Sequence, residues 1–321
     1  MEQEKILVVL PVKEEHKERI QNAAPDAKTT YCLEAEVTKE QVQDANIIIG
    51  NVKPEFLKDS RNLRWIQLNN AGTEGFCVPG ILPKQAQLTN ATGAYGMAIS
   101  EHLLAMLFAL QKRLDIYHDQ QTDHRWEKQT HMMVTEGSHV LVIGLGDIGT
   151  AFARKMKVLG AHVTGIRRSQ KPKPEYVDAQ YTMEALPELL PQADIVAMSL
   201  PGYSDTKGVI GEKELQLMKS NAILLNVGRG TAIDSLALAK ALQGRSIYGA
   251  GLDVTDPEPL PEDHPLWDAP HCIITPHVSG GYALPETLEK ILNLSIENLE
   301  RYEKGEALHN IIDFSTGYVK R

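Results

Sequence analysis

Short runs of β-branched and other apolar residues recur along the 321-residue chain, and stretches with helical spacing separate them. Four runs lie in the first hundred residues, at 6–10, 46–50, 63–68 and 86–90. Six more follow, at 139–144, 161–166, 194–200, 222–228, 248–254 and 272–276. Most of these runs are apolar at successive positions, which is typical of parallel strands covered on both faces. The pattern predicts an α/β protein with two doubly wound parallel sheets.

Two longer segments have helical spacing. Residues 98–118 are apolar at Ile99, Leu103 and Met106 and again at Leu107 and Phe108, so both faces of this helix need a cover. The tail from residue 283 also has helical spacing, but it is too short to form a domain. We therefore expect the tail to pack on the first unit. The predicted organisation is a discontinuous outer domain, 1–97 plus 283–321, around an inserted domain, 98–282.

Composition narrows the possible functions. The chain has 42 Asp and Glu residues against 33 Lys and Arg residues, a formal charge of −9, which argues against binding to a nucleic-acid backbone. The longest apolar run, Leu103 to Leu110, is far shorter than the roughly 18 residues that span a bilayer, so no membrane association is expected. The three cysteines, an odd number with no CxxC pair, support neither a disulfide framework nor a metal cluster. A reducing, cytoplasmic location fits best.

A GxGxxG motif follows the apolar run HVLVI and precedes a helical stretch. In this setting Gly144 is expected to make the tight turn and Gly146 to let a pyrophosphate approach the backbone. Gly149 would let the helix pack closely, and the helix N-terminus would bind phosphates. The motif predicts a dinucleotide site.

The next predicted strand ends without the acidic residue that normally binds the adenosine ribose of NAD. Arg167, Arg168 and Ser169 stand there instead. Arginine cannot accept a hydrogen bond from a ribose hydroxyl, but its guanidinium suits a 2′-phosphate. The sequence therefore favours NADP, with NAD as the other cofactor; two solvated arginines beside an NAD site remain the alternative.

Polar residues follow three later strands, where open α/β sheets bind ligands. Arg229 stands between two glycines after one strand, and its guanidinium suits a carboxylate and a carbonyl oxygen. Glu258 and His277 follow the next two strands, so they could form a carboxylate–imidazole pair for general acid catalysis. His264 and His271 are weaker candidates because they lie inside a loop and before a strand.

The motifs VIGLGDIG, LPGYSDTKGVIG, LLNVGRGTAIDSLALAKALQGRSIYGAGLDV, DPEP and TPHVSGGY occur here in one order. In this the chain resembles the D-isomer-specific 2-hydroxyacid dehydrogenases, in particular glyoxylate and hydroxypyruvate reductases. The resemblance implies a Rossmann nucleotide-binding domain inserted in a flavodoxin-like substrate domain. It implies hydride transfer between NADP or NAD and a small 2-keto or D-2-hydroxy acid. The helix that contains AISEH resembles the family's dimer-forming segment, which would explain its two apolar faces and implies a homodimer.

The resemblance also assigns roles to individual residues. Arg229, Glu258 and His277 match the family's catalytic set, and Ala71, Gly72 and Thr73 match the loop that binds the substrate carboxylate. Tyr95 departs from many members, which leaves the 2-keto acid open. The implied cofactor contacts are Gly144, Gly146, Asp147, Ile148, Gly149, Arg167, Arg168, Ser169, Pro201, Thr206, Val227, Gly228, Asp253, His277 and Gly280.

A second class of function is compatible with the same residues. This fold also serves as a dinucleotide-sensing, dimeric corepressor module, which binds the cofactor without turnover. Oxidation of NADPH in the presence of 2-keto acids distinguishes an enzyme from such a binding protein.

Overall fold

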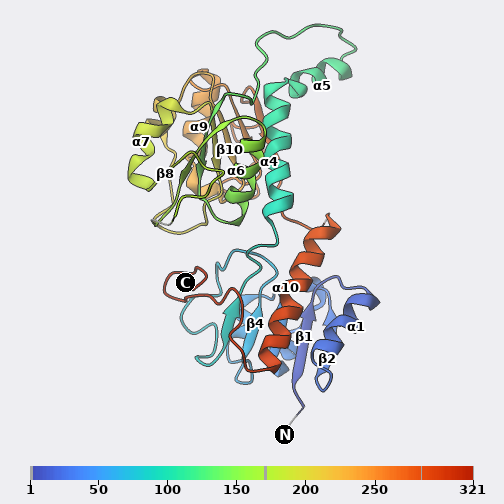
Figure 1. The fold of residues 1–321 in the computed structure, drawn as a ribbon. Coiled ribbons are helices and arrows are strands. Elements are labelled where there is room, and N and C mark those ends of the chain that lie inside the picture. Colours follow the sequence, from blue (N-terminus) through green and yellow to red (C-terminus); the bar gives the residue numbers. More distant parts are fainter. Residues whose placement is uncertain (1–2, 170–171, 283, 321) are drawn as a thin grey trace. The chain divides into compact units, whose positions relative to one another are not determined.

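The computed structural model of the protein describes residues 3–169, 172–282 and 284–320, and the chain divides into two compact units (Figure 1). Unit 1 comprises residues 1–95 and 282–321, and unit 2 comprises residues 96–281. The first boundary lies two residues before the expected position, and the second lies one residue before it. Ala283, where we expected the second segment of the outer domain to begin, lies outside the described residues.

Unit 1 contains a five-stranded parallel sheet with the strand order β2-β1-β3-β4-β5. Its strands are β1 (Lys5–Val9), β2 (Lys28–Cys32), β3 (Ile47–Gly50), β4 (Trp65–Gln67) and β5 (Gln87–Thr89). Its helices are α1 (Glu14–Ala23), the 3₁₀ turn η1 (Glu34–Glu36), α2 (Lys39–Asp44), α3 (Pro54–Leu57) and α10 (Pro285–Glu303). The chain reverses its direction of sheet growth between β1 and β3, as in flavodoxin-like folds.

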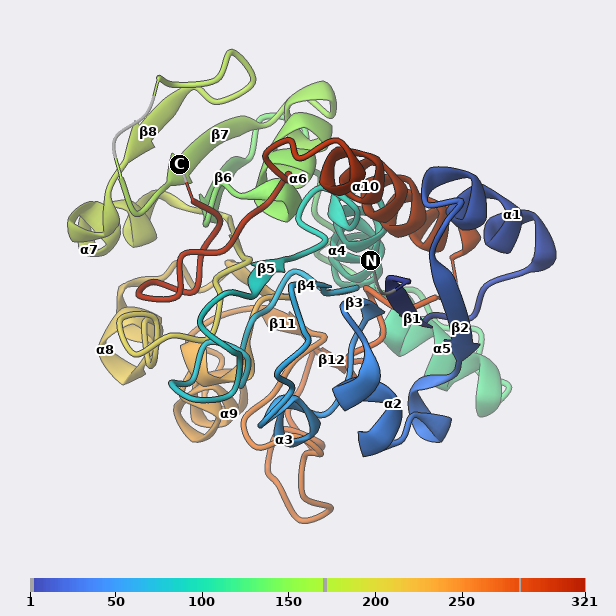
Figure 2. The same cartoon turned by 90° about the horizontal axis from the view of Figure 1, so that it is seen from below.

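The C-terminal helix α10 belongs to unit 1 because of its apolar face. Ile291, Leu292 and Leu299 are fully buried, and α10 lies beside α1 (Figure 2). A buried hydrogen bond of 2.8 Å from the Asn298 amide to the Gln67 side chain ties the helix to β4. The tail therefore completes the core of the unit in which the chain began.

Unit 2 contains a seven-stranded parallel sheet with the order β12-β11-β10-β9-β6-β7-β8. Its strands are β6 (His139–Ile143), β7 (His162–Ile166), β8 (Ala179–Tyr181), β9 (Ile195–Met198), β10 (Ile223–Asn226), β11 (Gly249–Leu252) and β12 (Cys272–Ile274). Its helices are α4 (Gly96–Gln111), α5 (Leu114–Thr122), α6 (Asp147–Val158), α7 (Leu186–Leu189), α8 (Glu212–Leu217) and α9 (Ser235–Gln243). Three 3₁₀ turns complete it: η2 (Met183–Ala185), η3 (Leu190–Gln192) and η4 (Gly230–Ala232).

Helices cover both faces of this sheet, which explains why its strands are apolar throughout. Leu141, Val196 and Leu224 form a buried cluster with Leu238 and Leu242 of α9 on one face. On the other face α4 packs against β10, β11 and α6. The predicted fold class, two doubly wound parallel-sheet domains, is thus confirmed. The strand order reverses between β6 and β9, which is where open α/β sheets bind a ligand, beyond the carboxyl ends of the strands.

The structure corrects two expectations about the helix at 98–118. It is not one helix, because Arg113 adopts a left-handed conformation (φ 55°) between α4 and α5. Of the three side chains expected at a dimer surface, Met106 and Leu107 are buried within unit 2, where Met106 packs against Gly251 of β11, so these two cannot contribute to one. Phe108, the third, is partly exposed.

None of the helices in the described ranges is long and apolar enough to cross a membrane.

Candidate active site

The glycine motif forms the turn between β6 and α6. Gly144 has φ +100°, which favours glycine, and a Cβ atom on Gly149 would lie 1.9 Å from the Gly144 carbonyl oxygen. These two glycines let α6 begin close to the strand. A Cβ on Gly146, by contrast, would meet no atom within 4 Å, so the backbone at the start of α6 is open to a ligand. This cradle fits the pyrophosphate of a dinucleotide.

Two expected cofactor residues lie in the first turn of α6. Ile148 is partly exposed there, and Asp147 carries the only acidic side chain of that turn. The Asp147 carboxylate accepts a hydrogen bond of 2.9 Å from the backbone N–H of Gly96, at the start of α4. Asp147 thus joins the N-termini of two helices.

Arg167 follows β7 directly and lies against the glycine turn. Its guanidinium donates a hydrogen bond of 3.2 Å to the Leu145 carbonyl, and its backbone N–H bonds to Tyr181 of β8. Arg168 is exposed and Ser169 is partly exposed. The first arginine is therefore held beside the pyrophosphate cradle, with two more hydrogen-bond donors following it in the chain.

The loops after β9 and β10 contain the next group of expected cofactor residues. Thr206 is buried, and its hydroxyl lies 2.6 Å from the Pro201 carbonyl, so it closes the loop after β9 on itself. Val227 is buried behind β10, and a Cβ on Gly228 would lie 2.4 Å from the Leu200 carbonyl oxygen. The two loops are thus packed directly on each other.

Arg229 is partly exposed at the end of β10. The Asn226 side chain accepts from the N–H of Gly228 (3.0 Å) and donates to the carbonyl of Arg229 (3.0 Å), so it fixes the backbone on both sides. The next residue, Gly230, has no room for a Cβ because Thr255 lies against it. The arginine side chain is therefore presented from a rigid turn.

Glu258 and His277 form the pair that their positions predict. The Glu258 carboxylate accepts a hydrogen bond of 2.9 Å from Nδ1 of His277. Its second oxygen accepts one of 3.0 Å from the N–H of Thr255, which orients the carboxylate. The side chains are 39% and 50% exposed, so both remain accessible to a ligand. Arg229, Glu258 and His277 follow β10, β11 and β12, which are neighbours in the sheet.

Asp253, at the end of β11, has a different environment. Its side chain is fully buried, and its two carboxylate oxygens accept four hydrogen bonds from Thr275, Val278 and Ser279. Four bonds match the lone-pair capacity of a carboxylate. Asp253 therefore holds the loop that carries His277 and Gly280. Neither His102 nor Thr275, which extend this hydrogen-bonded group, was singled out from the sequence.

In unit 1, the expected carboxylate-binding loop follows β4. Within the described residues the backbone N–H groups of Ala71 and Gly72 donate no hydrogen bond to the chain. The buried Thr73 hydroxyl donates to the Gly317 carbonyl (2.9 Å) and thus anchors the loop to the C-terminal segment. Nearby, the Tyr95 hydroxyl donates to the Asn69 carbonyl, and burial raises the pKa of Tyr95. Tyr95 is therefore an uncharged hydrogen-bond donor at neutral pH.

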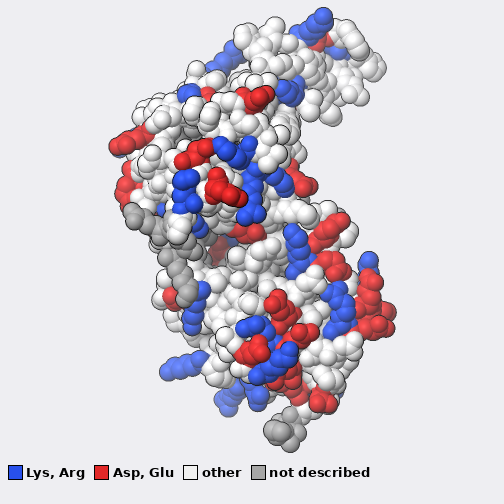
Figure 3. Space-filling view, in the orientation of Figure 1, with Lys and Arg blue, Asp and Glu red and all other residues white. Residues whose placement is uncertain are grey.

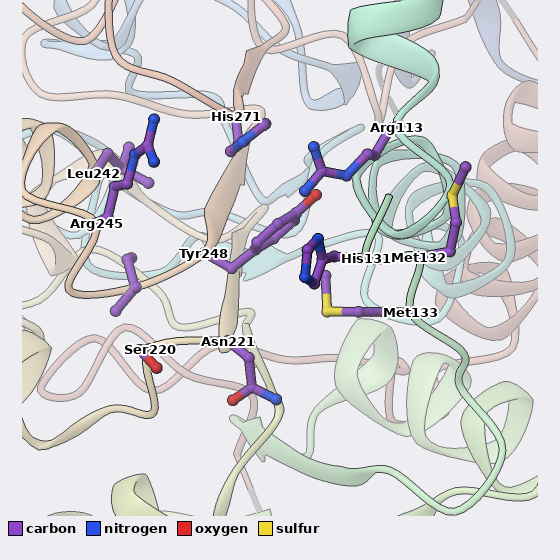
Figure 4. Close-up of a pocket in the computed structure, with 11 residues that line it drawn as sticks. Arg113, His131, Met132, Met133, Ser220, Asn221, Leu242, Arg245, Tyr248 and His271 are labelled. Carbon is purple, nitrogen blue, oxygen red and sulfur yellow. The ribbon is translucent and has the colours of Figure 1, made fainter. Parts of the chain in front are cut away.

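A second cavity in unit 2, of about 530 Å³, lies at the opposite edge of the sheet (Figure 4). Asn221, Tyr248 and His271 line it from positions before β10, β11 and β12. Tyr248 stacks on His271 with ring centroids 4.8 Å apart, and the Arg113 guanidinium lies 5.6 Å from the Tyr248 ring. Residues 131–133, which follow α5 and its loop, form another wall. This cavity is separate from the dinucleotide cradle.

Charged side chains do not form a surface of one sign on the visible face, where acidic and basic residues are interspersed (Figure 3).

One group of described residues has the spacing of metal ligands: Glu15, His16 and Glu289. His16 Nδ1 accepts from the N–H of Lys13 (3.1 Å), so Nε2 carries the proton that it donates to Glu289 (2.7 Å). Arg19 bonds to Glu289 as well, at 3.0 Å. With both ring nitrogens engaged, this group is an ion-pair network.

Comparison with known proteins identifies the family. Residues 104–279 match the model of the D-isomer specific 2-hydroxyacid dehydrogenase, NAD binding domain. The chain belongs to this family. A family protein from Aeromonas salmonicida subsp. salmonicida A449 has a similar structure, with a TM-score of 0.85, 30% identity, and coverage of 97% of this chain and 99% of the other. The resemblance seen in the sequence motifs is confirmed.

Two further relatives bear on the chemistry. A D-isomer specific 2-hydroxyacid dehydrogenase from Xanthobacter autotrophicus Py2, solved with NADPH and MES, has a TM-score of 0.81 at 26% identity and covers 98% of this chain and 100% of the other. A hydroxypyruvate reductase from Blautia hydrogenotrophica is 28% identical, over 87% of this chain and 89% of its own. The protein is an NAD(P)-dependent oxidoreductase that transfers hydride between its cofactor and a 2-keto or 2-hydroxy acid.

Proposed function

We propose that the protein reduces a small 2-keto acid to a D-2-hydroxy acid with NADPH, using His277 as the acid, Glu258 as its partner and Arg229 as the substrate anchor. The observation that carries this proposal is the 2.9 Å hydrogen bond between His277 Nδ1 and the Glu258 carboxylate, at neighbouring strand ends of the nucleotide-binding unit. When bound, the cofactor supplies the hydride that reduces the keto carbon.

His277 supplies the proton. Because Nδ1 is hydrogen-bonded to Glu258, Nε2 is the ring nitrogen left to face a substrate. In the acid form Nε2–H donates to the keto oxygen, and the proton moves to that oxygen as it becomes a hydroxyl. The ring is left neutral with its remaining proton on Nδ1, where Glu258 accepts it. The Glu258 carboxylate also stabilises the imidazolium before the transfer.

Arg229 binds the substrate. Its planar guanidinium offers paired donors to the carboxylate and the keto oxygen, and it favours the charge that builds on that oxygen. The rigid turn around Asn226 and Gly230 supports this role because it limits the loss of side-chain and backbone freedom on binding. In unit 1, the N–H groups of Ala71 and Gly72 and the loop held by Thr73 are the proposed carboxylate ligands.

The cofactor assignment rests on the cradle and on the residues after β7. Gly144, Gly146 and Gly149 would hold the pyrophosphate. Arg167, Arg168 and Ser169 would bind the 2′-phosphate of NADPH, which gives it preference over NADH. The similar protein from Xanthobacter autotrophicus with bound NADPH supports this preference. Ile148, Pro201, Thr206, Val227, Gly228 and Gly280 would form the walls of the same site.

For the assembly, a homodimer is proposed, but Met106 and Leu107, which are buried in unit 2, are not part of its surface. The segment 123–134 projects with α5 from the rest of unit 2 (Figure 1). It carries Trp126, which is 98% exposed, together with exposed Met132 and Val134. A second copy of this chain would bury these side chains. A cytoplasmic location is proposed as well, supported by three cysteines that are all unpaired.

The proposed function is tested with a panel of 2-keto acids, including hydroxypyruvate, glyoxylate and pyruvate, against NADPH and NADH. Turnover of at least one acid with NADPH is expected. His277→Ala should lower kcat by about 10²–10⁴, the usual contribution of general acid–base catalysis, while NADPH affinity hardly changes. Tight NADPH binding without turnover of any acid would indicate the dinucleotide-sensing module, and full activity of His277→Ala would remove this residue from the mechanism.

A further inference from the structure

Asp253 anchors the loop 275–279, which contains His277. Besides the four hydrogen bonds to the side chain, the backbone carbonyl of Asp253 accepts a 2.8 Å bond from the N–H of His277 itself. His277 has φ +52°, a left-handed conformation that costs free energy in a residue with a Cβ atom. The conformation persists because the surrounding hydrogen bonds enforce it. The position of His277 Nε2 therefore depends on the hydrogen bonds that Asp253 and Thr275 make.

A second histidine reaches this anchor from α4. His102 Nε2 lies 2.9 Å from the Thr275 hydroxyl, and that hydroxyl lies 2.6 Å from the Asp253 carboxylate. A carboxylate can only accept, so the single hydroxyl proton of Thr275 points to Asp253. Thr275 must then accept from His102, which requires a proton on His102 Nε2. Donation runs in one direction, from His102 to Thr275 to Asp253.

His102 does not act on Asp253 directly. Its Nε2 lies 3.7 Å from the nearest Asp253 oxygen, which is too long for a hydrogen bond. Through Thr275, however, it strengthens the hydroxyl as a donor, since hydrogen bonds in a chain polarise one another. It also fixes the Thr275 hydroxyl in the orientation that Asp253 needs. His102 is only about one-quarter exposed, so water competes weakly for this contact.

We infer that His102 is a positioning residue for the reaction: by donating from Nε2 to Thr275, it holds the loop 275–279 so that His277 keeps the geometry of proton transfer. This inference rests on the proposed role of His277. His102 contributes one hydrogen-bond donor, which faces the Thr275 hydroxyl. A neutral donor at the same position would orient Thr275 equally well. The cofactor cradle around Gly144 is formed by other residues and is independent of this donor.

Three substitutions separate this role from packing. The side-chain nitrogen of glutamine is three bonds from Cβ, as His102 Nε2 is, whereas that of asparagine is only two. His102→Gln thus keeps the donor in reach of Thr275, His102→Asn is the matched control that keeps the chemistry without the reach, and His102→Leu removes the donor. We expect His102→Gln to keep kcat within about threefold of the parent. The Asn and Leu variants should lose about 10- to 100-fold, as a displacement of the acid of about 1 Å would cause.

The Michaelis constant for the keto acid and the dissociation constant for NADPH should both stay within about twofold in all three variants, because only the position of His277, the acid, changes. A double-mutant cycle gives a further measurement. Thr275→Val removes the hydroxyl but keeps the shape of the side chain, so in that background His102→Leu should add almost nothing to the loss of kcat. If Thr275→Val does not fold, Thr275→Ala, which also removes the hydroxyl, replaces it as the background for His102→Leu.

Equal activity of the Gln, Asn and Leu variants would overturn the inference, and so would a Gln variant as impaired as the Asn variant. Additive losses in the cycle would overturn it as well, because they mean that His102 does not act through Thr275. These outcomes are distinguishable from failure of the proposed function. If the proposed function fails, the parent enzyme itself shows no turnover, or His277→Ala remains active.

Discussion

One hydrogen bond decides which atom of His277 can react. With Nδ1 bonded to the Glu258 carboxylate, proton transfer is confined to Nε2. Glu258→Gln deletes the negative charge that favours the protonated ring while keeping the size of the side chain. The kcat for reduction of a keto acid by NADPH should then fall by about tenfold, because the imidazolium loses the charge that stabilises it. Steady-state kinetics at a fixed pH measures this, and an unchanged kcat would contradict the functional pairing of the two residues.

Arg167 is the residue on which cofactor choice is expected to depend. Its guanidinium lies against the Leu145 carbonyl in the glycine turn, and charge-assisted hydrogen bonds to a phosphate contribute roughly 1.5–3 kcal/mol each. Solvent exposure reduces the net preference for NADPH to about tenfold to a thousandfold in kcat/KM. Arg167→Asp should abolish or reverse it, because the carboxylate repels the 2′-phosphate and accepts from the ribose of NADH. A parent enzyme that uses NADH as well as NADPH would contradict this prediction.

Residues differ in how far the sequence reveals them, and the reason is topological. Arg229, Glu258 and His277 could be predicted because each lies in the loop after a strand, and neighbouring parallel strands end at one edge of a sheet. His102 could not be predicted, because it contacts Thr275 across 173 positions of sequence and lies in the middle of a helix. The burial of Asp253 was also hidden, since an aspartate after a strand is just as typical of a ligand-binding residue.

At the scale of elements, the turn from β6 to α6 contains one glycine that the packing of the helix requires and another that the binding of the cofactor requires. A Cβ at position 149 would collide with the Gly144 carbonyl at 1.9 Å, whereas position 146 is open. Gly149→Ala should therefore lower the melting temperature, because α6 must move away from the strand. Gly146→Ala should leave the melting temperature unchanged but weaken NADPH binding, because the methyl group occupies the space for the pyrophosphate. Thermal unfolding and NADPH titration of both variants measure the two effects. Equal losses of stability would contradict the assignment.

Helices α1 and α10 of unit 1 are joined by charges. The hydrogen bond from Arg19, followed by that from His16, lowers the pKa of Glu289. A carboxylate with a lowered pKa stabilises the folded state above its pKa in the unfolded chain, and this stabilisation is lost as the pH falls through the folded value.

Glu289→Gln should therefore lower the urea midpoint at pH 7 and lower it less at about pH 3, because the stabilisation declines as the pH falls below the pKa of the unfolded chain and then through that of the folded state. The pair is partly exposed, so the loss at pH 7 should be about 1 kcal/mol or less. Glu300→Gln is a matched control, because Glu300 is exposed on the same helix and its side chain has no hydrogen bond or ion pair among the described residues. An effect of Glu289→Gln that is the same at both pH values would contradict the ion-pair account.

Elements that the sequence did not predict are two of the four edge strands and the break in the long helix. These two strands, β2 (Lys28–Cys32) and β8 (Ala179–Tyr181), contain polar side chains and no fully buried residue, so they lack the continuous apolar run that predicts a covered strand. The break at Arg113 carries no glycine or proline signal, and helical spacing of apolar residues continues through it. The central strands, which are buried on both faces, were predicted correctly, and so were the edge strands β5 and β12.

At the scale of the whole molecule, the two units share one arrangement of sheet and loops. Each is a parallel sheet, and the residues proposed to bind and reduce the substrate lie after strand ends: 71–73 follow β4 in unit 1, and Arg229, Glu258 and His277 follow β10, β11 and β12 in unit 2. The side chains that belong to neither core nor site, above all those of the segment after α5, require another explanation.

The exposed segment 123–134 leads to the prediction about assembly. Trp126 is 98% exposed, and large aromatic side chains that become buried at the centre of an interface often contribute 2 kcal/mol or more, a loss of about 30-fold in affinity when truncated. The parent protein should sediment as a dimer at micromolar concentration, and Trp126→Ala should raise the dissociation constant of the dimer by about that factor. Trp267→Ala is the matched control, because Trp267 is also exposed but lies in the loop before β12 and bonds to the Pro261 carbonyl. Sedimentation of the parent as a monomer, or equal weakening by both substitutions, would show that this segment does not join two copies.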